Sequence, residues 1–386
     1  MLFNSIEFII FFIFIALFLL LLRKNKDISI LVIIFFSLLF YGYEKAQWII
    51  LILFSISINY LCSYLIKKNV KYIFNFGIIF NLGILFFYKY LGFFFTNLNF
   101  LFEQNFSYLN IALPIGISFY SFQQISYLFD CREKKNSLPR FSEYLLYVSF
   151  FPQLIAGPIV KSKDFFIQVT KNYFLKPTKI MVLKGITIFI IGLFKKTFIA
   201  DNIAIFSDAV FNNANSGTIG FLDSWIGVFA FSLQIYFDFS SYSDMAIGLG
   251  LILGVKLPIN FSSPYKSENI IEFWRSWHIT LSNFLREYLY IKIGGNRNGR
   301  IRNFINFFIV MILGGIWHGA SWTFVLWGVV HAIYISTNHF IIDLFHKYQV
   351  KIKIPQFIKI LFTFCIVSIA WVFFRSENIE IAVKIF

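Results

Sequence analysis

The chain has 386 residues and a formal net charge of +15, from 34 Lys and Arg against 19 Asp and Glu, and 58% of its residues are hydrophobic, 22% aromatic and only 14% charged. Since soluble domains carry about 25% charged residues, this composition excludes a soluble globular enzyme and a disordered chain, and three cysteines are too few for a disulfide scaffold. The basic residues form short clusters between long apolar runs, which is typical of a polytopic membrane protein and not of one that binds nucleic acid.

The N-terminal quarter of the chain predicts four membrane-spanning helices. Basic residues follow the first apolar run, 8–22, which is the reverse of the order in a cleavable signal peptide, so we expect an uncleaved span. The runs 28–43, 46–66 and 72–95 each approach the ~20 residues that a helix needs to cross the hydrocarbon. We expect helices throughout, because a segment in lipid must satisfy its own backbone groups.

The distribution of Lys and Arg over the loops predicts the orientation of these spans. Basic clusters around Arg23, Lys67 and Arg132 alternate with the nearly neutral loop 43–46 and with 96–110, which contains no Lys or Arg. Because Lys and Arg mark the cytoplasmic side, the N-terminus is expected outside. The other basic residues of the first and third clusters are Lys24, Lys26, Lys134, Lys135 and Arg140.

The middle of the chain predicts broken segments. Basic residues both precede and follow the apolar stretch 141–160, which contains Pro152 and Pro158, so we expect a re-entrant segment there. The stretch around Pro114 is expected to be broken in a similar way. We expect 180–200 to cross outward, and the next segment to return at 221–253 with an interruption at the polar stretch 236–244.

The C-terminal third predicts one hairpin and one further span. Residues 303–341 must enter and return, because basic clusters that include Arg300 and Lys351 flank them, and a last span is expected at 357–374. The sequence therefore predicts an all-α fold, a single integral-membrane domain over 1–386 with about 9–11 transmembrane or re-entrant helices.

Ionisable side chains at membrane depth are the candidates for chemistry, because each costs about 2.5–3.5 kcal/mol to insert. His318 stands in a long uncharged stretch next to Gly314, Gly315 and Gly319. The glycines leave room for another molecule to approach, and imidazole is suited to proton transfer near neutral pH. The alternative is a structural histidine that is hydrogen-bonded to a neighbouring helix, with glycines for close packing.

His278 is a second candidate, at the end of the aromatic segment Phe273–His278. Helical spacing predicts Trp274 and His278 on one face and Arg275 on another. The alternative is an amphipathic helix that lies in the membrane interface. Among the remaining histidines, His331 need not share a face with His318, whereas His339 and His346 are expected near the inside loop.

Other residues suggest binding rather than proton transfer. Asp238 is expected either to orient a histidine or to pair with Arg275, or else to act as a polar clamp in a broken helix. The loop 294–300 is either a positive-inside loop or a basic lip that attracts a phosphorylated donor. The sequence contains no HExxH or CxxC spacing, so we expect no metal.

Several motifs together resemble a known family. They occur in order along the chain, as Leu113–Gln123, Phe151–Ile159, Tyr236–Asp244, Pro258–Phe261, Phe273–His278 and Gly315–Gly319. The set resembles the membrane-bound O-acyltransferase (MBOAT) family, in particular the bacterial branch that O-acetylates alginate or peptidoglycan. The resemblance is specific because several motifs occur in order. A lone Trp-His-Gly would not be specific.

The resemblance implies a site and a fold. His318 would be the essential histidine of the family and His278 its second polar active-site position, in a multi-helix fold around a narrow central tunnel. We expect the substrate-binding residues to be Asp238, Trp274, Arg275 and Trp317. Chains of this branch usually continue for several dozen residues beyond a segment like Trp371–Arg375, so this chain is expected to lack the last C-terminal segment of the family.

The resemblance also implies a function. We expect transfer of an acetyl group from a cytoplasmic thioester, acetyl-CoA, to a polysaccharide acceptor, with no bound cofactor. We expect a multi-pass protein of the bacterial cytoplasmic (inner) membrane, in contact with membrane lipids and with an extracytoplasmic partner of the SGNH-type acetyltransferase class. Two alternatives remain open. One is transfer of D-alanine to teichoic acid, and the other is a non-enzymatic transporter whose His and Asp residues line a path.

Overall fold

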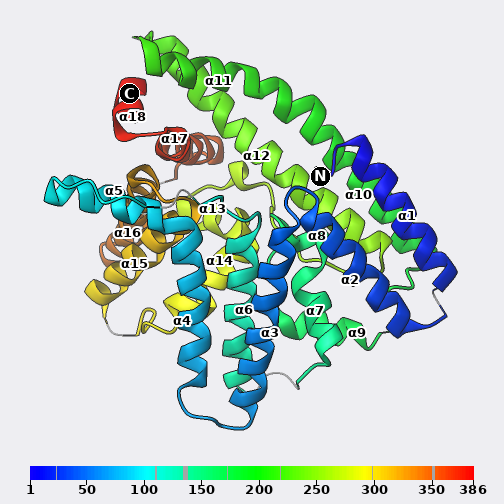
Figure 1. Cartoon of the computed structure of the whole chain (residues 1–386). Helices are drawn as coiled ribbons and strands as arrows, with labels where there is room; N and C mark the ends of the chain where they lie inside the picture. Colours follow the sequence, from blue (N-terminus) through cyan, green and yellow to red (C-terminus); the bar gives the residue numbers. More distant parts are fainter. Residues whose placement is uncertain are drawn as a thin grey trace. The chain divides into compact units, whose positions relative to one another are not determined.

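The computed structural model describes residues 1–22, 24–108, 111–133, 138–171, 173–217, 219–297, 299–349 and 353–386 (Figure 1). These residues form helices joined by loops, with no strand among them, so the predicted all-α fold is confirmed. Some residues of the predicted basic clusters and loops lie outside the described residues, namely Arg23, the end of 96–110, Lys134, Lys135, Asn298 and Lys351.

Among the described residues, five helical runs are long and apolar enough to cross a membrane, and the chain is a multi-pass membrane protein. A shorter apolar helix, α1 (Ile6–Leu22), precedes them. The large apolar side chains that these helices expose, such as Ile79 at 68%, are those that lipid covers in a bilayer. The five runs are α3 (Gln47–Lys67), Ile73–Phe102, α15 (Arg300–His318), α16 (Trp322–Lys347) and α17 (Gln356–Arg375).

The described residues divide into two compact units, so the predicted single domain stays a prediction. The first unit comprises Met1–Leu193 and Ser241–Pro258. Within it α3, α4 (Ile73–Leu85) and α6 (Ile117–Arg132) pack side by side, and α2 (Lys26–Gly42) packs on α7 (Phe141–Ser149). Its other elements include the π-helix η1 (Phe86–Tyr90), α5 (Leu91–Phe102), α8 (Phe151–Leu154), α9 (Ser162–Val169) and α10 (Lys179–Phe194).

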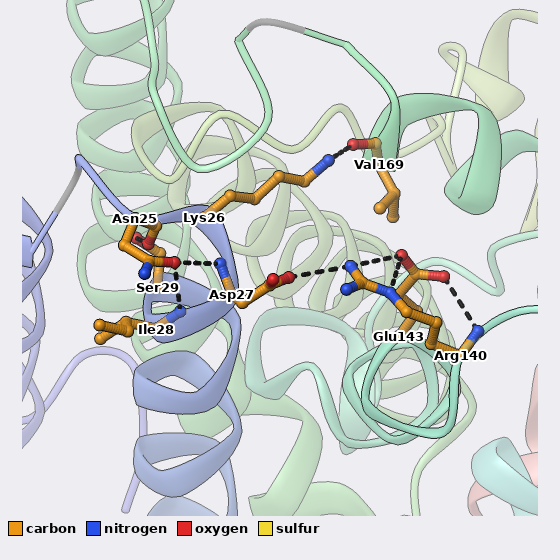
Figure 2. A network of polar contacts seen from close by, with 8 residues as sticks. All are labelled: Asn25, Lys26, Asp27, Ile28, Ser29, Arg140, Glu143 and Val169. Carbon is orange, nitrogen blue, oxygen red and sulfur yellow. Dashed lines mark hydrogen bonds and ion pairs between the residues drawn. The ribbon is translucent and has the colours of Figure 1, made fainter.

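A polar network ties the start of α2 to α7 and to the end of α9, as Figure 2 shows. The Asn25 side chain caps α2 by accepting hydrogen bonds from the backbone N–H groups of Asp27 and Ile28. The Arg140 guanidinium pairs with Asp27 and with Glu143, at 2.9 Å each, and the Lys26 ammonium donates to the carbonyl of Val169. Such a network fixes the mutual positions of three helix ends, although exposed pairs contribute only ~0–1 kcal/mol each.

The two predicted breaks in the first unit are confirmed. α7 ends at Ser149, and Phe150 then leaves the helical conformation with ψ of 105°. Phe150, Phe151 and Leu154 are fully buried, which is the condition under which non-helical backbone is tolerated at membrane depth. Before α6, Gly116 takes φ of +71°, and a Cβ at this position would lie 2.7 Å from the carbonyl oxygen of Leu154. The expected dip of 141–160 into the bilayer stays a prediction.

The predicted interruption at 236–244 is wrong, because α12 (Phe221–Ile252) is one continuous helix of 32 residues. The stretch contains no Gly and no Pro, so nothing in it removes a backbone hydrogen bond. The predicted end of a span at residue 200 is likewise not observed. The helical run continues from α10 through the π-helix η2 (Lys195–Ala200) into α11 (Asp201–Ser216).

The second unit comprises Phe194–Ser240 and Ile259–Phe386. The predicted hairpin at 303–341 is confirmed as α15 and α16, and the predicted last span as α17. Glycines allow the two hairpin helices to touch, since a Cβ at Gly315 would lie 2.2 Å from the Phe324 carbonyl oxygen. The remaining elements of the unit are the 3₁₀ turn η3 (Pro264–Lys266), α13 (Ile270–Ser276), α14 (Ile279–Leu285), the π-helix η4 (Arg286–Tyr290) and α18 (Ile379–Ile385).

Candidate active site

His318 is the last residue of α15, and its half-buried ring is held between aromatic side chains. The ring centroid lies 5.2 Å from that of Trp327 and 5.1 Å from that of Phe374, both in edge-on geometry. A Cβ on the next residue, Gly319, would lie 2.0 Å from the ring of Phe324, so any larger residue here would displace the ring or the backbone. The chain leaves α15 directly after His318, where Gly319 takes an extended conformation.

A pocket of about 590 Å³ gives access to His318. One face of α15 forms a wall of this pocket over almost the whole length of the helix. From Asn303 to His318 the helix rises by about 22 Å, at ~1.5 Å per residue. The lining residues on this face follow helical spacing, as Asn303, Phe307, Val310, Met311, Gly314 and His318.

The pocket changes from polar to aromatic along α15. At the first turn of the helix, the Tyr290 hydroxyl donates a 2.6 Å hydrogen bond to Asn303, and the rings of Phe307 and His339 stack at 5.1 Å. The cationic side chains of Arg275 and Arg286 also line the pocket. At the other end of the helix, the ring of Trp327 lies next to His318, and the ring of Trp274 lies 5.7 Å from that of Trp327, measured between centroids. All three residues line the pocket. The arrangement suits an elongated ligand with a polar and an apolar end.

A buried histidine positions the tryptophan in this wall. The indole N–H of Trp274 donates a 3.3 Å hydrogen bond to Nδ1 of His331, a residue with no exposed surface. The His331 ring also stacks on Phe273, at 6.3 Å between centroids. The sequence does not predict a role for His331. Its spacing from His318 does not indicate a contact with Trp274, which lies on α13.

His278 lies at the N-terminal end of α14, with φ of 42° and only 1% of its surface exposed. Its Nδ1 is 3.2 Å from Oδ1 of Asn260, and the same oxygen accepts hydrogen bonds from the backbone N–H and the hydroxyl of Thr280. Its Nε2 is buried without a hydrogen-bond partner among the described residues. His278 lies between two seven-residue helices that are too short to span a membrane, and burial lowers its pKa from 6.5 to about 3.

Trp317 contacts both candidate histidines, with ring centroids 6.2 Å from His278 and 4.9 Å from His318. Of the predicted site residues, Trp274, Arg275 and His318 line the pocket. His278, Trp317 and Asp238 do not belong to the described residues that line it. The structure therefore brings the two histidines to one tryptophan, but not into one pocket.

Asp238 does not pair with Arg275, as one reading of the sequence proposed. Its carboxylate lies 2.6 Å from the ammonium of Lys196, which also pairs with Asp201 at 2.9 Å. The reason is that α12 and the π-helix η2 place these side chains together, whereas Arg275 faces the pocket. Among the described residues, no group of three or more His, Cys, Asp or Glu could hold a metal ion.

Comparisons with known proteins match the family that the sequence motifs resemble. The model of a family described as MBOAT, membrane-bound O-acyltransferase family, matches residues 79–375. The chain is 40% identical to a peptidoglycan O-acetyltransferase of Helicobacter pylori, over 94% of this chain and 74% of that protein. It is 39% identical to a probable alginate O-acetylase of Pseudomonas aeruginosa (80% and 58%) and 27% identical to a teichoic acid D-alanyltransferase of Bacillus subtilis (63% and 62%). The chain thus spans less than two thirds of the length of the last two.

Proposed function

Because the chain belongs to the membrane-bound O-acyltransferase family, we propose that it transfers an acetyl group from a cytoplasmic thioester donor for O-acetylation of a cell-surface or exported polysaccharide. One observation carries this proposal. The ring of His318 lies at the aromatic end of a 590 Å³ pocket, where a reactant can reach it. The similarity to an enzyme named for peptidoglycan O-acetylation supports the acetyl group and the polymer class.

The pocket fits a thioester donor such as acetyl-CoA, which acts as a substrate and not as a resident cofactor. A pantetheine-type arm is long and narrow, and the pocket follows α15 for about 22 Å. Arg275 and Arg286 offer positive charge for the phosphates of the donor, while Trp274 offers an apolar wall for its acyl end. The first turn of α15 follows a basic loop, which positive-inside reasoning places on the cytoplasmic side, where the donor is made.

His318 acts as the general base in this proposal. Its neutral imidazole takes the proton of the attacking hydroxyl while the oxygen forms a bond to the acyl carbon. The carbon–sulfur bond of the thioester then breaks, and the imidazolium returns its proton to the departing thiolate. The edge-on contacts with Trp327 and Phe374 hold the ring in one orientation for both proton transfers.

The geometry changes the role that we assign to His278. A hydrogen bond from this ring to the donor carbonyl would require a proton on Nε2. The N–H of Thr280 can only donate, so the Asn260 atom that it contacts is the oxygen, and His278 must carry its proton on Nδ1. The single proton of the incoming hydroxyl goes to His318, so we propose that Nε2 of the neutral ring accepts a hydrogen bond from a water held next to Trp317.

The remaining expectations concern the acceptor side. The turn after His318 is predicted to lie toward the extracytoplasmic face, since α15 starts at the basic loop. An exported polysaccharide, or a serine of an SGNH-type acetyltransferase that relays the acetyl group, would meet His318 from that face. The inner membrane of a bacterium is the location that fits both a cytoplasmic donor and an exported acceptor.

D-alanyl transfer to teichoic acid is the second candidate, because one relative at 27% identity carries that name. The experiment that separates the two supplies membranes, prepared with their native polymer and partners, with labelled acetyl-CoA or with labelled D-alanine on its carrier protein. We expect label in the polymer from acetyl-CoA only, and only in membranes that contain the chain. Label from D-alanine alone would contradict acetyl transfer.

A further inference from the structure

A second cavity, of 670 Å³, lies in the first unit, where the loop between α3 and α4 meets the end of α6. We propose that this cavity binds the phosphate headgroup of an anionic membrane phospholipid. Lipid binding at this cavity is independent of the acyl-transfer chemistry, because none of the described residues that line it belongs to the candidate active site.

Three cations line the cavity: Lys67, Lys71 and Arg132. The amide side chains of Asn69 and Asn75 line it as well, and its described lining includes no Asp or Glu. A phosphodiester prefers this combination, because ammonium and guanidinium groups supply charge and amides supply further hydrogen-bond donors.

Arg132 is oriented for such a ligand. Its guanidinium lies over the ring of Phe74, at 4.4 Å from the centroid, so one of its faces is covered. No described residue forms an ion pair or a side-chain hydrogen bond with this guanidinium. Its N–H edge is the part that a phosphate binds in a bidentate manner.

The position of the cavity favours a lipid over a soluble anion. Lys67 ends one candidate membrane span and Ile73 begins the next, so we place the cavity at a membrane surface. On α4 the cavity residue Asn75 is followed on the same helix face by Ile79 and Leu82, which are 68% and 49% exposed. A headgroup in the cavity would thus place its acyl chains along an apolar helix face.

The test measures lipid binding to the purified full chain in detergent, by native mass spectrometry with phosphatidylglycerol and with phosphatidylcholine of the same acyl chains. We expect the wild type to retain phosphatidylglycerol preferentially. Since the ammonium and the guanidinium each make charged hydrogen bonds to the phosphate in this proposal, Lys71→Gln and Arg132→Gln should each weaken that binding about fivefold. Arg132→Lys should restore only part of it, because lysine keeps the charge but not the bidentate N–H edge.

Lys68→Gln is the matched control. Lys68 is in the same loop and carries the same charge, but it lies over the ring of Tyr64 at 4.6 Å and does not line the cavity. We expect it to change binding less than twofold. Three results would overturn the proposal: equal retention of both lipids by the wild type, an equal loss in Lys68→Gln, or displacement of the lipid by an equal concentration of inorganic phosphate. The first of these comparisons needs no variant.

Discussion

Nδ1 of His278 lies 3.2 Å from Oδ1 of Asn260, and the backbone N–H of Thr280 donates to the same oxygen. This contact makes Asn260 a positioning residue, because the carbonyl oxygen of its amide holds the proton of His278 on Nδ1. Asn260→Asp keeps the acceptor but adds a negative charge, which favours the imidazolium and raises the pKa of His278.

We therefore expect Asn260→Asp to move the acidic limb of the pH–rate profile of acetyl transfer to higher pH, whereas Asn260→Leu lowers the rate at every pH. Nitrogen NMR of histidine-labelled protein, with His278→Gln to assign the signal, reads the tautomer without any activity. A proton on Nε2 of the wild type would contradict the assignment.

Stability should depend on pH through the same ring. Burial lowers the pKa of His278 to about 3, so between pH 6.5 and 3 the unfolded chain binds a proton that the folded chain does not. The contribution of the neutral ring is therefore fully present above pH 6.5 and falls as the pH is lowered. We expect the wild type to lose more thermal stability from pH 7 to pH 5 than His278→Gln does. Parallel curves for the two proteins would show that the ring does not titrate in this way.

The hydrogen bond between Trp274 and His331 should be visible in a double-mutant cycle. His331→Phe keeps a ring in the buried site but removes the acceptor of the indole N–H, which should cost about 1–3 kcal/mol of unfolding free energy. Trp274→Phe in the same background removes the donor and should recover part of that loss. Thermal unfolding of the four proteins gives the coupling. Strictly additive losses would mean that the bond does not stabilise the pocket wall.

Gly319→Ala should displace the turn that carries His318. Its Cβ would lie 2.0 Å from the Phe324 ring, so the turn or the ring must move, and we expect at least a tenfold loss of transfer rate. Phe324→Leu should restore part of the rate in this background. Gly83→Ala is the matched control on α4, where a Cβ would meet nothing within 4 Å. Comparable losses in the two single variants would point to a general effect on folding.

Local patterns in the sequence predict the long helices and the breaks between them. The apolar runs mark α3, α15, α16 and α17, because a helix in lipid needs both the length and the apolar surface. Gly116 and the segment before Pro152 predict the breaks that the structure contains, since glycine and proline act on the backbone directly.

Contacts between distant residues were not predictable from one sequence. Asn260 and His278 are 18 positions apart, Lys196 and Asp238 are 42 apart, and Trp274 and His331 are 57 apart. Each pair depends on how helices pack against one another, and the periodicity of the sequence does not show that packing. α12 is continuous where the sequence predicts an interruption, because serine and aspartate do not break a helix, whereas glycine or proline weakens the helical backbone directly.

The most direct measurement is acetyl transfer from labelled acetyl-CoA by membranes that contain His318→Ala or His346→Ala at equal protein level. His346 lies on α16 and does not belong to the described lining of the pocket, so it controls for the loss of an imidazole. Removal of a general base should lower the rate by about 10²–10⁴ in His318→Ala and leave His346→Ala near wild type. Near wild-type transfer by His318→Ala would contradict the assignment of His318 as the base.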